Sequence, residues 1–586
     1  MHPVNSNQNI IHKDVKSFLK KPNFIDYAEF SKKFLLEDFE KEIDYFKDGS
    51  LNISYNLVDR HTLGKGRNKI AIYFEGEKGN KEEYTYEKLK KLTNKFASVL
   101  IKNKVKKGDR VFIFLPNIPE RHISFIGILK IGAVAGPLFP AFQEIALFDR
   151  LKDCEAKVLV TNSVLFPRIK KIWKDLPSLE KIIIVERGSV DQPKEKRIVY
   201  YQKEMDNASD NFLPVHTDKN DLSYILYTSG TTGKPKGVAH SHYDILQAIL
   251  TTKYVLDIHE DERYWCTADL GWVTGVVYNV LGILGLGGTL ILYEGRFSPE
   301  NWYKIIEEYK VNVWYTAPTA IRMLMGSKVK AKDFNLSSLR HLVSVGEPLN
   351  PEAIWWGLEA FNLPFHDTWW QTELGAISVS NYASLDIKPG SMGKPFPGVI
   401  AAIIDEKGNE LPANKEGNLA IKKDTVSSLM KQIWKNDEKY KSYFIKDWYV
   451  SGDRAYKDDD GYFWFFGRTD DVIKTAGERV GPFEVESALV EYPDIIEAGV
   501  IGKPDMTRGE IIKAFVVLKQ GVEKNDKTKE KIKMFVKNNL AGHLYPREIE
   551  FIDKLPKTRS GKIMRRVLKA KELGLPLGDL STLEDY

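Results

Sequence analysis

The stretch from Tyr227 to Gly237, YTSGTTGKPKG, constrains this chain more than any other. It gathers glycines, hydroxyl side chains and two lysines directly after Leu222 to Tyr227, an apolar run typical of a strand. The residues that follow, Val238 to Thr252, predict a helix. Glycines let backbone N–H groups turn inward, and lysine adds positive charge without demanding a fixed geometry. The pattern predicts a phosphate-binding loop.

The two most familiar phosphate motifs do not fit this loop. A Walker A loop ends in glycine followed by Lys-Ser or Lys-Thr, and counting from Gly230 places Pro235 in the glycine position. A dinucleotide fingerprint requires three glycines, and in the stretch that begins at Gly285 the third position is Leu290. Neither a P-loop nucleotidase nor a Rossmann dehydrogenase is supported.

Composition narrows the class of protein. A chain of 586 residues with 43% hydrophobic residues predicts several folded domains rather than one. Its 86 basic and 80 acidic residues nearly balance, which argues against a nucleic-acid partner. Two cysteines, Cys154 and Cys266, fit a reducing compartment. The polar stretch from Met1 to Lys16 does not resemble a signal peptide, so we expect a cytoplasmic protein.

One uncharged stretch, Leu270 to Tyr293, is long enough to cross a bilayer. It contains Asn279 and several glycines, and it breaks at Gly285-Leu-Gly287-Gly288. A buried helix, a turn and a buried strand explain this pattern better than a membrane span. We therefore expect no membrane association.

Short apolar runs alternate with helical patterns over residues 66–215 and 222–405, which predicts βαβ units and a parallel sheet. Residues 399–466 read as a small β-rich section, and residues 471–573 read as a separate α+β unit. The predicted fold class is α/β. We expect an N-terminal wrap at 1–65, a large domain of parallel and mixed sheets covered by helices at 66–469, and a small C-terminal domain at 470–586.

Polar patches follow several of the predicted strands, where ligands bind in open α/β sheets. They are Ser344–Pro348 (SVGEP), Asp367–Glu373 (DTWWQTE), Tyr449–Asp453 (YVSGD) and, far along the chain, Pro556–Lys562 (PKTRSGK). The carboxylate of Asp453 suits a pair of ribose hydroxyls. Together with the glycine-rich loop, these patches predict a nucleotide site.

The order of these motifs resembles that of the acyl-adenylate-forming (AMP-binding) enzymes, and most closely their acetyl-CoA synthetase branch. The branch-level likeness lies in Leu51–His61, Thr267–Gly275, Tyr315–Arg322 and the pair Trp369-Trp370, and it extends over about residues 25–575. The resemblance implies ATP-dependent activation of acetate to acetyl-AMP with release of pyrophosphate. Transfer of the acetyl group to coenzyme A (CoA) then gives acetyl-CoA and AMP, and Mg²⁺ accompanies ATP.

The resemblance also implies roles for individual residues in the first step. Lys562 would bridge the carboxylate and the α-phosphate, a task that suits a flexible point charge, and Glu373 and Thr372 would assist it, Glu373 by holding Mg²⁺. The implied nucleotide-binding residues are Thr228, Ser229, Gly230, Thr231, Thr232, Gly233, Lys234 and Lys236 at the β- and γ-phosphates; Gly346, Glu347, Pro348, Asp367, Thr368 and Trp369 around adenine; Asp453 and Arg468 at ribose; and Thr372 and Arg479 at phosphate.

Trp370 is the implied determinant of substrate size, with Val273, Thr274 and Val345 as further walls of the acyl pocket. An indole in that pocket leaves room for one or two carbons. Because one methylene is worth only about 1–3 kcal/mol in a hydrophobic pocket, propionate or another short acid remains an alternative substrate.

The second step implies rotation of a mobile C-terminal domain about a hinge at Asp470. CoA would then meet Ala476, Gly477 and Glu478, with Lys537 and Arg168 as candidates for its 3′-phosphate. Leu374 and Ala476 depart from the threonine and serine usual in the family. A lysine acetyltransferase or deacetylase acting on Lys562 is an implied partner. A degenerate member that binds without catalysis is the alternative from another class, and the intact Lys562, Asp453 and Glu373 argue against it.

Overall fold

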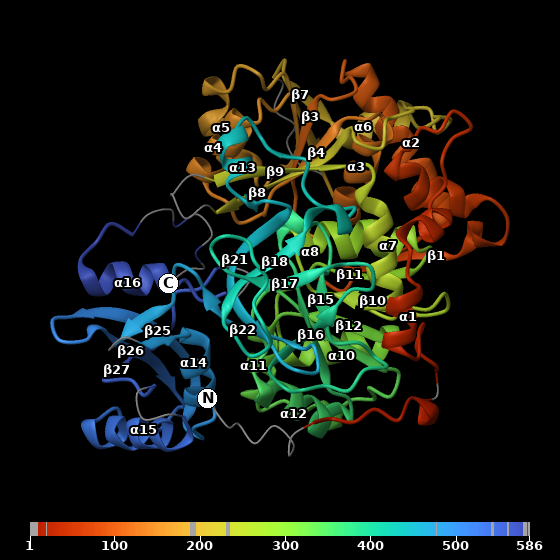
Figure 1. The fold of residues 1–586 in the computed structure, drawn as a ribbon. Helices are drawn as coiled ribbons and strands as arrows, with labels where there is room; N and C mark the ends of the chain where they lie inside the picture. Colours follow the sequence, from red (N-terminus) through yellow and green to blue (C-terminus); the bar gives the residue numbers. More distant parts are fainter. Residues whose placement is uncertain are drawn as a thin grey trace.

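The computed structural model describes residues 10–18, 20–187, 195–229, 235–475, 478–540, 544–558, 562–577, 580 and 583, with the backbone alone at 17, 229 and 479. Within these residues the strands form sheets of eight, fourteen and five strands. The chain is a mixed α/β protein, as predicted. The five-stranded sheet and its helices stand beside the rest of the molecule (Figure 1, blue).

The eight-stranded sheet has the order β19-β9-β8-β4-β3-β5-β6-β7. Its strands are β3 (Arg110–Phe114), β4 (Val134–Pro137), β5 (Val158–Asn162), β6 (Lys181–Val185), β7 (Ile198–Tyr200), β8 (Leu222–Ser229), β9 (Pro235–Ser241) and β19 (Gln432–Ile433). The helices along this part of the chain are α2 (Tyr86–Lys102), α3 (Pro119–Lys130), α4 (Glu144–Asp153), α5 (Phe166–Ile172) and α6 (Tyr201–Asn207). The strands β3 to β6 lie where the apolar runs predicted them, and they pair in parallel.

The helix predicted after the glycine-rich loop, Val238 to Thr252, is confirmed only from Asp244 onward, and its first residues are a strand. Residues 235–241 form β9, which pairs antiparallel with β8 so that Thr228 lies opposite Lys236. Helix α7 (Asp244–Tyr254) begins only after this strand. Val238 and Ala239 are buried in β9, which lies between β8 and β19. Burial within the sheet outweighs the helical periodicity of this segment.

The fourteen-stranded sheet has the order β17-β18-β21-β22-β16-β15-β14-β13-β12-β10-β11-β1-β2, with β20 beside β21. Its strands are β1 (Ile70–Glu75), β2 (Lys81–Thr85), β10 (Arg263–Cys266), β11 (Thr289–Tyr293), β12 (Val313–Thr316), β13 (His341–Ser344), β14 (Phe365–Trp369), β15 (Val379–Ser380), β16 (Ser391–Pro395), β17 (Ala401–Ile404), β18 (Gly417–Lys422), β20 (Phe444–Ile445), β21 (Trp448–Lys457) and β22 (Phe463–Arg468). Strands β17, β18, β20, β21 and β22 pair antiparallel and correspond to the β-rich section predicted at 399–466, with β22 continuing to Arg468. Strands β15 and β16, also antiparallel, lie before that section.

Helices α10 (Pro299–Tyr309), α11 (Pro318–Met325), α12 (Pro351–Phe361) and α13 (Asp437–Lys441) accompany this sheet. The uncharged stretch from Leu270 forms a buried helical segment, with α8 (Val273–Val276), a π-helical turn (Val277–Leu281) and α9 (Gly282–Gly285), and it ends in strand β11. This is the helix, turn and strand that we predicted. Among the described residues, no helix has both the length and the apolar character needed to span a membrane.

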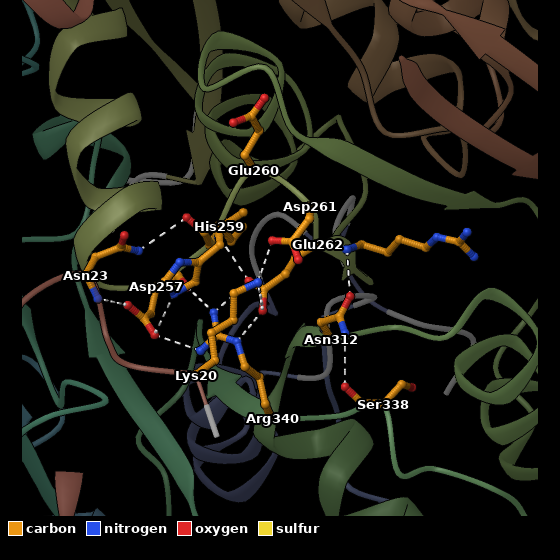
Figure 2. A network of polar contacts seen from close by, with 12 residues as sticks. Lys20, Asn23, Asp257, His259, Glu260, Asp261, Glu262, Asn312, Ser338 and Arg340 are labelled. Carbon is orange, nitrogen blue, oxygen red and sulfur yellow. Dashed lines mark hydrogen bonds and ion pairs between the residues drawn. The ribbon is translucent and has the colours of Figure 1, made fainter. Parts of the chain in front are cut away.

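The N-terminal segment, with α1 (Tyr27–Lys33) and several short 3₁₀ turns, is tied to the large sheet by a polar network (Figure 2). The backbone N–H of Asn23 donates to Asp257 Oδ1 at 2.7 Å. Arg340 pairs with the same carboxylate at 2.7 Å and with Glu262. Arg340 directly precedes β13, so this anchor lies at the amino ends of the parallel strands. The opposite, carboxyl ends remain accessible for a ligand.

The five-stranded sheet consists of β23 (Ile473–Thr475), β24 (Glu478–Val480), β25 (Ile495–Asp505), β26 (Gly509–Leu518) and β27 (Glu548–Phe551). Helices α14 (Pro482–Val490), α15 (Asp526–Asn539) and α16 (Arg565–Leu573) accompany it. Helices α14 and α15 share a hydrophobic core with the sheet that includes Val485, Val500 and Val536, and α16 packs Leu568 into a smaller cluster with Phe515. Phe483 of α14 meets Phe465 of β22 at 6.0 Å between ring centroids, which joins this unit to the large sheet (Figure 1).

Candidate nucleotide and acyl site

Asp453 is the centre of a buried polar cluster. Its Oδ2 accepts hydrogen bonds from Trp369 Nε1 at 2.9 Å and from Gln371 Nε2 at 3.1 Å, and its Oδ1 accepts one from Arg468 at 2.8 Å. Asp453 and Arg468 lie opposite each other on β21 and β22, while the tryptophan closes β14. Trp369 and Arg468 stand at the ends of strands and Gln371 lies two residues beyond β14, so the carboxylate is held by donors from three sides. The DTWWQTE and YVSGD motifs and Arg468 therefore meet at one carboxylate.

The glycine of the SVGEP motif turns the chain at the end of β13. Gly346 has φ +94°, which L side chains rarely adopt, and an added Cβ would meet no atom within 4 Å. The backbone is therefore open to a flat ligand at this point. The next residue, Glu347, is held by Arg322 and Thr319, each at 2.7 Å. Its carboxylate is thus neutralised and turned toward α11.

The two residues at the head of DTWWQTE face into the protein. Asp367 and Thr368 are buried, and Thr368 Oγ1 donates to the backbone oxygen of Ser344 at 2.8 Å. Burial raises the pKa of Asp367 well above its usual range. These side chains join β13 to β14 and leave the neighbouring backbone to face a ligand. The role of Asp367 and Thr368 beside adenine remains a prediction. Their buried side chains support the local backbone.

A second polar cluster lies where the phosphate loop was predicted. Lys236 Nζ lies 3.8 Å from Glu373 Oε1 and also contacts the hydroxyl of Tyr443. The Tyr443 hydroxyl donates to the same Glu373 oxygen at 2.9 Å. Thr372 contributes its backbone oxygen, which accepts from His240 Nε2 at 2.9 Å. Thr228 Oγ1 is buried and has no hydrogen-bond partner within the described ranges.

Several predicted phosphate ligands lie outside the described residues. These are Gly230, Thr231, Thr232, Gly233 and Lys234. For Ser229 and Arg479 only the backbone is described, in β8 and β24. The flanking pair Thr228 and Lys236 places the ends of the loop beside Glu373.

The two clusters are connected. The Tyr449 hydroxyl donates to Gln371 Oε1 at 2.7 Å, while the amide of the same Gln371 donates to Asp453. Tyr449 stacks on Tyr443 at 5.8 Å between ring centroids. Hydrogen bonds therefore link Asp453, Gln371 and Tyr449, and the stacking of Tyr449 on Tyr443 joins them to the cluster of Tyr443, Glu373 and Lys236. The two adjoining clusters suit a ligand with hydroxyls at one end and phosphates at the other.

The sequence analysis assigned no role to Tyr443, Tyr449 or Gln371. Tyr449 and Gln371 stand inside the motifs YVSGD and DTWWQTE, whereas Tyr443 stands in none. Gln371 stands inside a recognised motif, so its position was a usable signal. Tyr443 follows α13 in a stretch of lysines and acidic residues that reads as a solvated turn. Only the pairing of β20 with β21 brings it to the site.

The residues predicted to wall the acyl pocket lie in one apolar region. Trp370 packs edge-on against Tyr278 at 5.2 Å between ring centroids. Val345 belongs to the same hydrophobic cluster, and Val273 packs against it. Thr274 is buried on α8. The indole is held by a buried aromatic partner, so it cannot swing aside easily to admit a longer chain.

Lys562 reaches the interface from the small domain. A cavity between the domains is lined by Glu347, Pro348 and Asn350 from one side and by Glu497, Lys562 and Arg565 from the other. The Lys562 side chain is exposed overall. Desolvation at this interface lowers its pKa, Arg468 lowers it further, and Asp453 opposes the shift. The lysine therefore lies within electrostatic range of the buried Asp453 cluster.

The other residues predicted for CoA and for the hinge do not gather at this site. Asp470 is exposed in the turn after β22, and Glu478 is exposed at the start of β24. Lys537 is exposed near the end of α15, with its ammonium 5.5 Å from the Tyr545 ring. Arg168 donates to the backbone oxygens of Pro140 and Phe142, which ties it to the large domain. Ala476 and Gly477 lie outside the described residues.

The residues present fit a Mg²⁺ ion carried by a nucleotide. Mg²⁺ in such sites takes one or two carboxylates together with phosphates and water. Glu373 supplies one carboxylate 3.8 Å from Lys236, which lies opposite Thr228 across the β8–β9 pair. No group of three or more His, Cys, Asp or Glu that suits a metal occurs in the described part of the chain, which agrees with an ion held mainly by its nucleotide.

Comparison with known proteins agrees with this geometry. The family model described as AMP-binding enzyme matches residues 59–434, and the AMP-binding enzyme C-terminal domain matches residues 484–562. The chain is 55% identical to an acetyl-coenzyme A synthetase of Bacillus subtilis (strain 168), covering 92% of this chain and 93% of that protein. It is 43% identical to an acetyl-coenzyme A synthetase of Methanothrix thermoacetophila, covering 95% and 89%.

Two solved structures share the fold. An acyl-CoA synthetase of Brucella canis has a TM-score of 0.73 at 33% identity, with 94% of this chain and 99% of that chain covered. The anthranilate CoA ligase AuaEII, solved with anthranoyl-AMP, has a TM-score of 0.83 at 30% identity, with 90% and 98% covered. The site geometry, the two family models and these relatives agree, and the chain belongs to the AMP-binding enzyme family.

Proposed function

We propose that this chain is an AMP-forming acetate–CoA ligase. It activates acetate with ATP to acetyl-AMP, releases pyrophosphate, and transfers the acetyl group to CoA with release of AMP. The observation that carries the proposal is the pair of adjoining polar clusters, Asp453 with Gln371 and Glu373 with Lys236, which the stacked rings of Tyr449 and Tyr443 join, with Lys562 in the cavity between the domains. Its relatives named acetyl-coenzyme A synthetase support acetate as the acid.

The residues divide the first step between them. Asp453 and Arg468 hold the ribose hydroxyls, and the backbone at Gly346 to Pro348 borders adenine. Thr228, Lys236 and the loop between them hold the β- and γ-phosphates. Glu373 would hold the Mg²⁺ that accompanies ATP, and Thr372 contacts phosphate. Lys562 holds the acetate carboxylate against the α-phosphorus, because attack by one anion on another requires fixed positive charge. The carboxylate oxygen bonds to phosphorus as the bond to pyrophosphate breaks.

The acyl pocket selects the acid by size. Trp370, backed by Tyr278, closes the space that a longer chain would need, and Val273, Thr274 and Val345 form the other walls. Propionate is the alternative substrate, since a single methylene is weakly discriminated in an apolar pocket.

In the second step the C-terminal unit, residues 470–586, turns about Asp470 and removes Lys562 from the site. Ala476, Gly477 and Glu478 then line the path of the CoA thiol, whose sulfur bonds to the acyl carbon as AMP leaves. Lys537, exposed on the same unit, contributes positive charge toward the 3′-phosphate. Arg168 is dropped as a candidate because its guanidinium is already bound to backbone oxygens.

The proposal also covers regulation by lysine acetylation and the location of the protein in the cell. Acetylation of Lys562 by a lysine acetyltransferase, reversed by a deacetylase, would switch off the first step by removing its charge. A cytoplasmic location is supported by the free, buried thiols of Cys154 and Cys266.

The test is acid-dependent exchange between ATP and labelled pyrophosphate, run with acids of two to six carbons, followed by product analysis with CoA present. Acetate is expected to support the fastest exchange and to yield AMP and pyrophosphate. Formation of ADP would refute the mechanism. Faster exchange with propionate than with acetate would select the alternative substrate, and no exchange with any acid would favour a non-catalytic binding protein.

A further inference from the structure

Tyr443 connects the two charged side chains of the phosphate subsite through one hydroxyl. Lys236 Nζ donates to this hydroxyl, and the hydroxyl donates to Glu373 Oε1 at 2.9 Å. The direct separation of Lys236 Nζ from Glu373 Oε1 is 3.8 Å. The tyrosine therefore lies between the cation and the anion and sets how far apart they stand.

The tyrosine ring is held rigidly by the strand that carries Asp453. The backbone oxygen of Tyr443 accepts from Val450 N of β21 at 2.8 Å. Its ring lies almost parallel to that of Tyr449, at 15° and 5.8 Å between centroids. Tyr449 is fully buried and fixed through Gln371. The hydroxyl at the phosphate end is thus placed by the same strand that places the carboxylate at the ribose end.

The electrostatic surroundings keep this hydroxyl protonated. Burial, and then the neighbouring Glu373, raise the pKa of Tyr443. The group therefore donates to the carboxylate and accepts from an ammonium, in one direction along the chain of hydrogen bonds. Charge-assisted hydrogen bonds of this kind hold side chains more firmly than neutral ones.

We propose that Tyr443 is a positioning residue for the first half-reaction: its hydroxyl fixes Lys236 and Glu373 relative to each other and so shapes the subsite for the β- and γ-phosphates. The inference rests on the proposed function, since it assigns that subsite to ATP and pyrophosphate. It predicts an effect on phosphate binding and on adenylation, and none on the thioester-forming step, which takes place after pyrophosphate has left.

The test compares Tyr443→Phe with Tyr440→Phe in the full-length protein. Both changes remove one phenol hydroxyl from the same short segment, and the hydroxyl of Tyr440 has no hydrogen bond among the residues that the structure describes. Calorimetry measures the affinity for pyrophosphate and for ATP, with and without Mg²⁺. Kinetics then measure ATP–pyrophosphate exchange and, separately, acetyl-CoA formation from supplied acetyl-AMP.

In Tyr443→Phe, the affinity for pyrophosphate and the exchange kcat/KM for ATP are each expected to fall about tenfold, the loss typical of one hydrogen bond to a charged group. Acetyl-CoA formation from acetyl-AMP and the melting temperature should match those of Tyr440→Phe. Unchanged pyrophosphate affinity, or equal loss in both half-reactions, overturns the inference. If the unmodified protein binds Mg·ATP but catalyses no acid-dependent exchange, the proposed function fails, while the affinity ratio between the two variants still decides the role of Tyr443.

Discussion

The indole Nε1 of Trp369 donates a hydrogen bond to Oδ2 of Asp453 at 2.9 Å, and both side chains are buried. The bond joins residues 84 positions apart, from β14 and β21. The first tryptophan of the pair thus orients the carboxylate proposed for ribose, while the second, Trp370, packs on Tyr278 in the proposed acyl pocket. In the proposed function, the two adjacent indoles therefore serve different substrates.

Trp369→Phe is expected to raise the KM for ATP about 3- to 10-fold, because Asp453 loses one of its neutral donors. The KM for acetate should change little, since Trp370 remains. Steady-state kinetics with each substrate varied in turn provide the measurement, and Trp355→Phe, at a 40% exposed tryptophan of α12, is the matched control. A rise in the KM for acetate alone would contradict this division of roles.

Trp370→Gly is expected to shift the preferred acid to four or more carbons, with a lower kcat/KM for acetate. The cavity left beside Tyr278 accommodates the added methylenes. Removing a fully buried large aromatic typically costs about 3–5 kcal/mol. Because Trp370 is only partly buried, a smaller cost and a modest fall in the melting temperature are expected. The measurement is kcat/KM across straight-chain acids. An unchanged optimum at acetate would show that another residue limits chain length.

Lys562→Ala is expected to reduce acetate-dependent ATP–pyrophosphate exchange by at least about a hundredfold, because the developing negative charge loses its counter-ion. Acetyl-CoA formation from supplied acetyl-AMP should persist. Lys527→Ala, which removes an exposed lysine of α15, serves as the control and should retain both activities. Full exchange activity in Lys562→Ala would require a different residue at the α-phosphate.

The orientation of the two domains is expected to depend on pH through Glu352. Burial, and then the facing carboxyl of Glu491, raise the pKa of Glu352 from 4.5 to about 7. Because the raised pKa belongs to the closed arrangement, its stabilisation is complete below pH 4.5 and is lost as the pH rises through about 7. Small-angle X-ray scattering should therefore show a more open molecule above that range.

Glu352→Gln should remove this pH dependence, because the amide stays neutral beside Glu491. Glu359→Gln, an exposed position on the same helix α12, should keep it. Identical pH profiles for the two variants would mean that another interdomain contact, such as the hydrogen bond from Asn350 to Ser487 at 2.7 Å, governs the orientation.

Much of the fold was predictable because buried strands appear in the sequence as short apolar runs. The strands β3, β5 and β13 are short apolar runs between helical stretches, and each lies where the pattern indicated. The end of strand β9, residues 238–241, was assigned to the following helix because so short a segment has no period that distinguishes a buried strand from a buried helix. Only its pairing with β8 decides between them.

The same limit explains which site residues were found. Asp453 and Glu373 stand in compact motifs, and the structure places each in a polar cluster. Tyr443 has no local signature, since its role depends on the stacking of its ring on Tyr449, from a neighbouring strand. A side chain such as Tyr443, which reaches the site through a contact with another strand, cannot be predicted from local sequence patterns.

The antiparallel pairing of Thr228 with Lys236 has a consequence for turnover. Helix α7 begins at Asp244, well after the phosphate loop, so the loop lacks the permanent dipole of a helix that starts beside it. In the proposed function, the attraction for pyrophosphate draws on lysine charge, and the ammonium of Lys236 can instead pair with Glu373. This pairing would weaken the attraction once adenylation is complete and so favour departure of the leaving group over its retention.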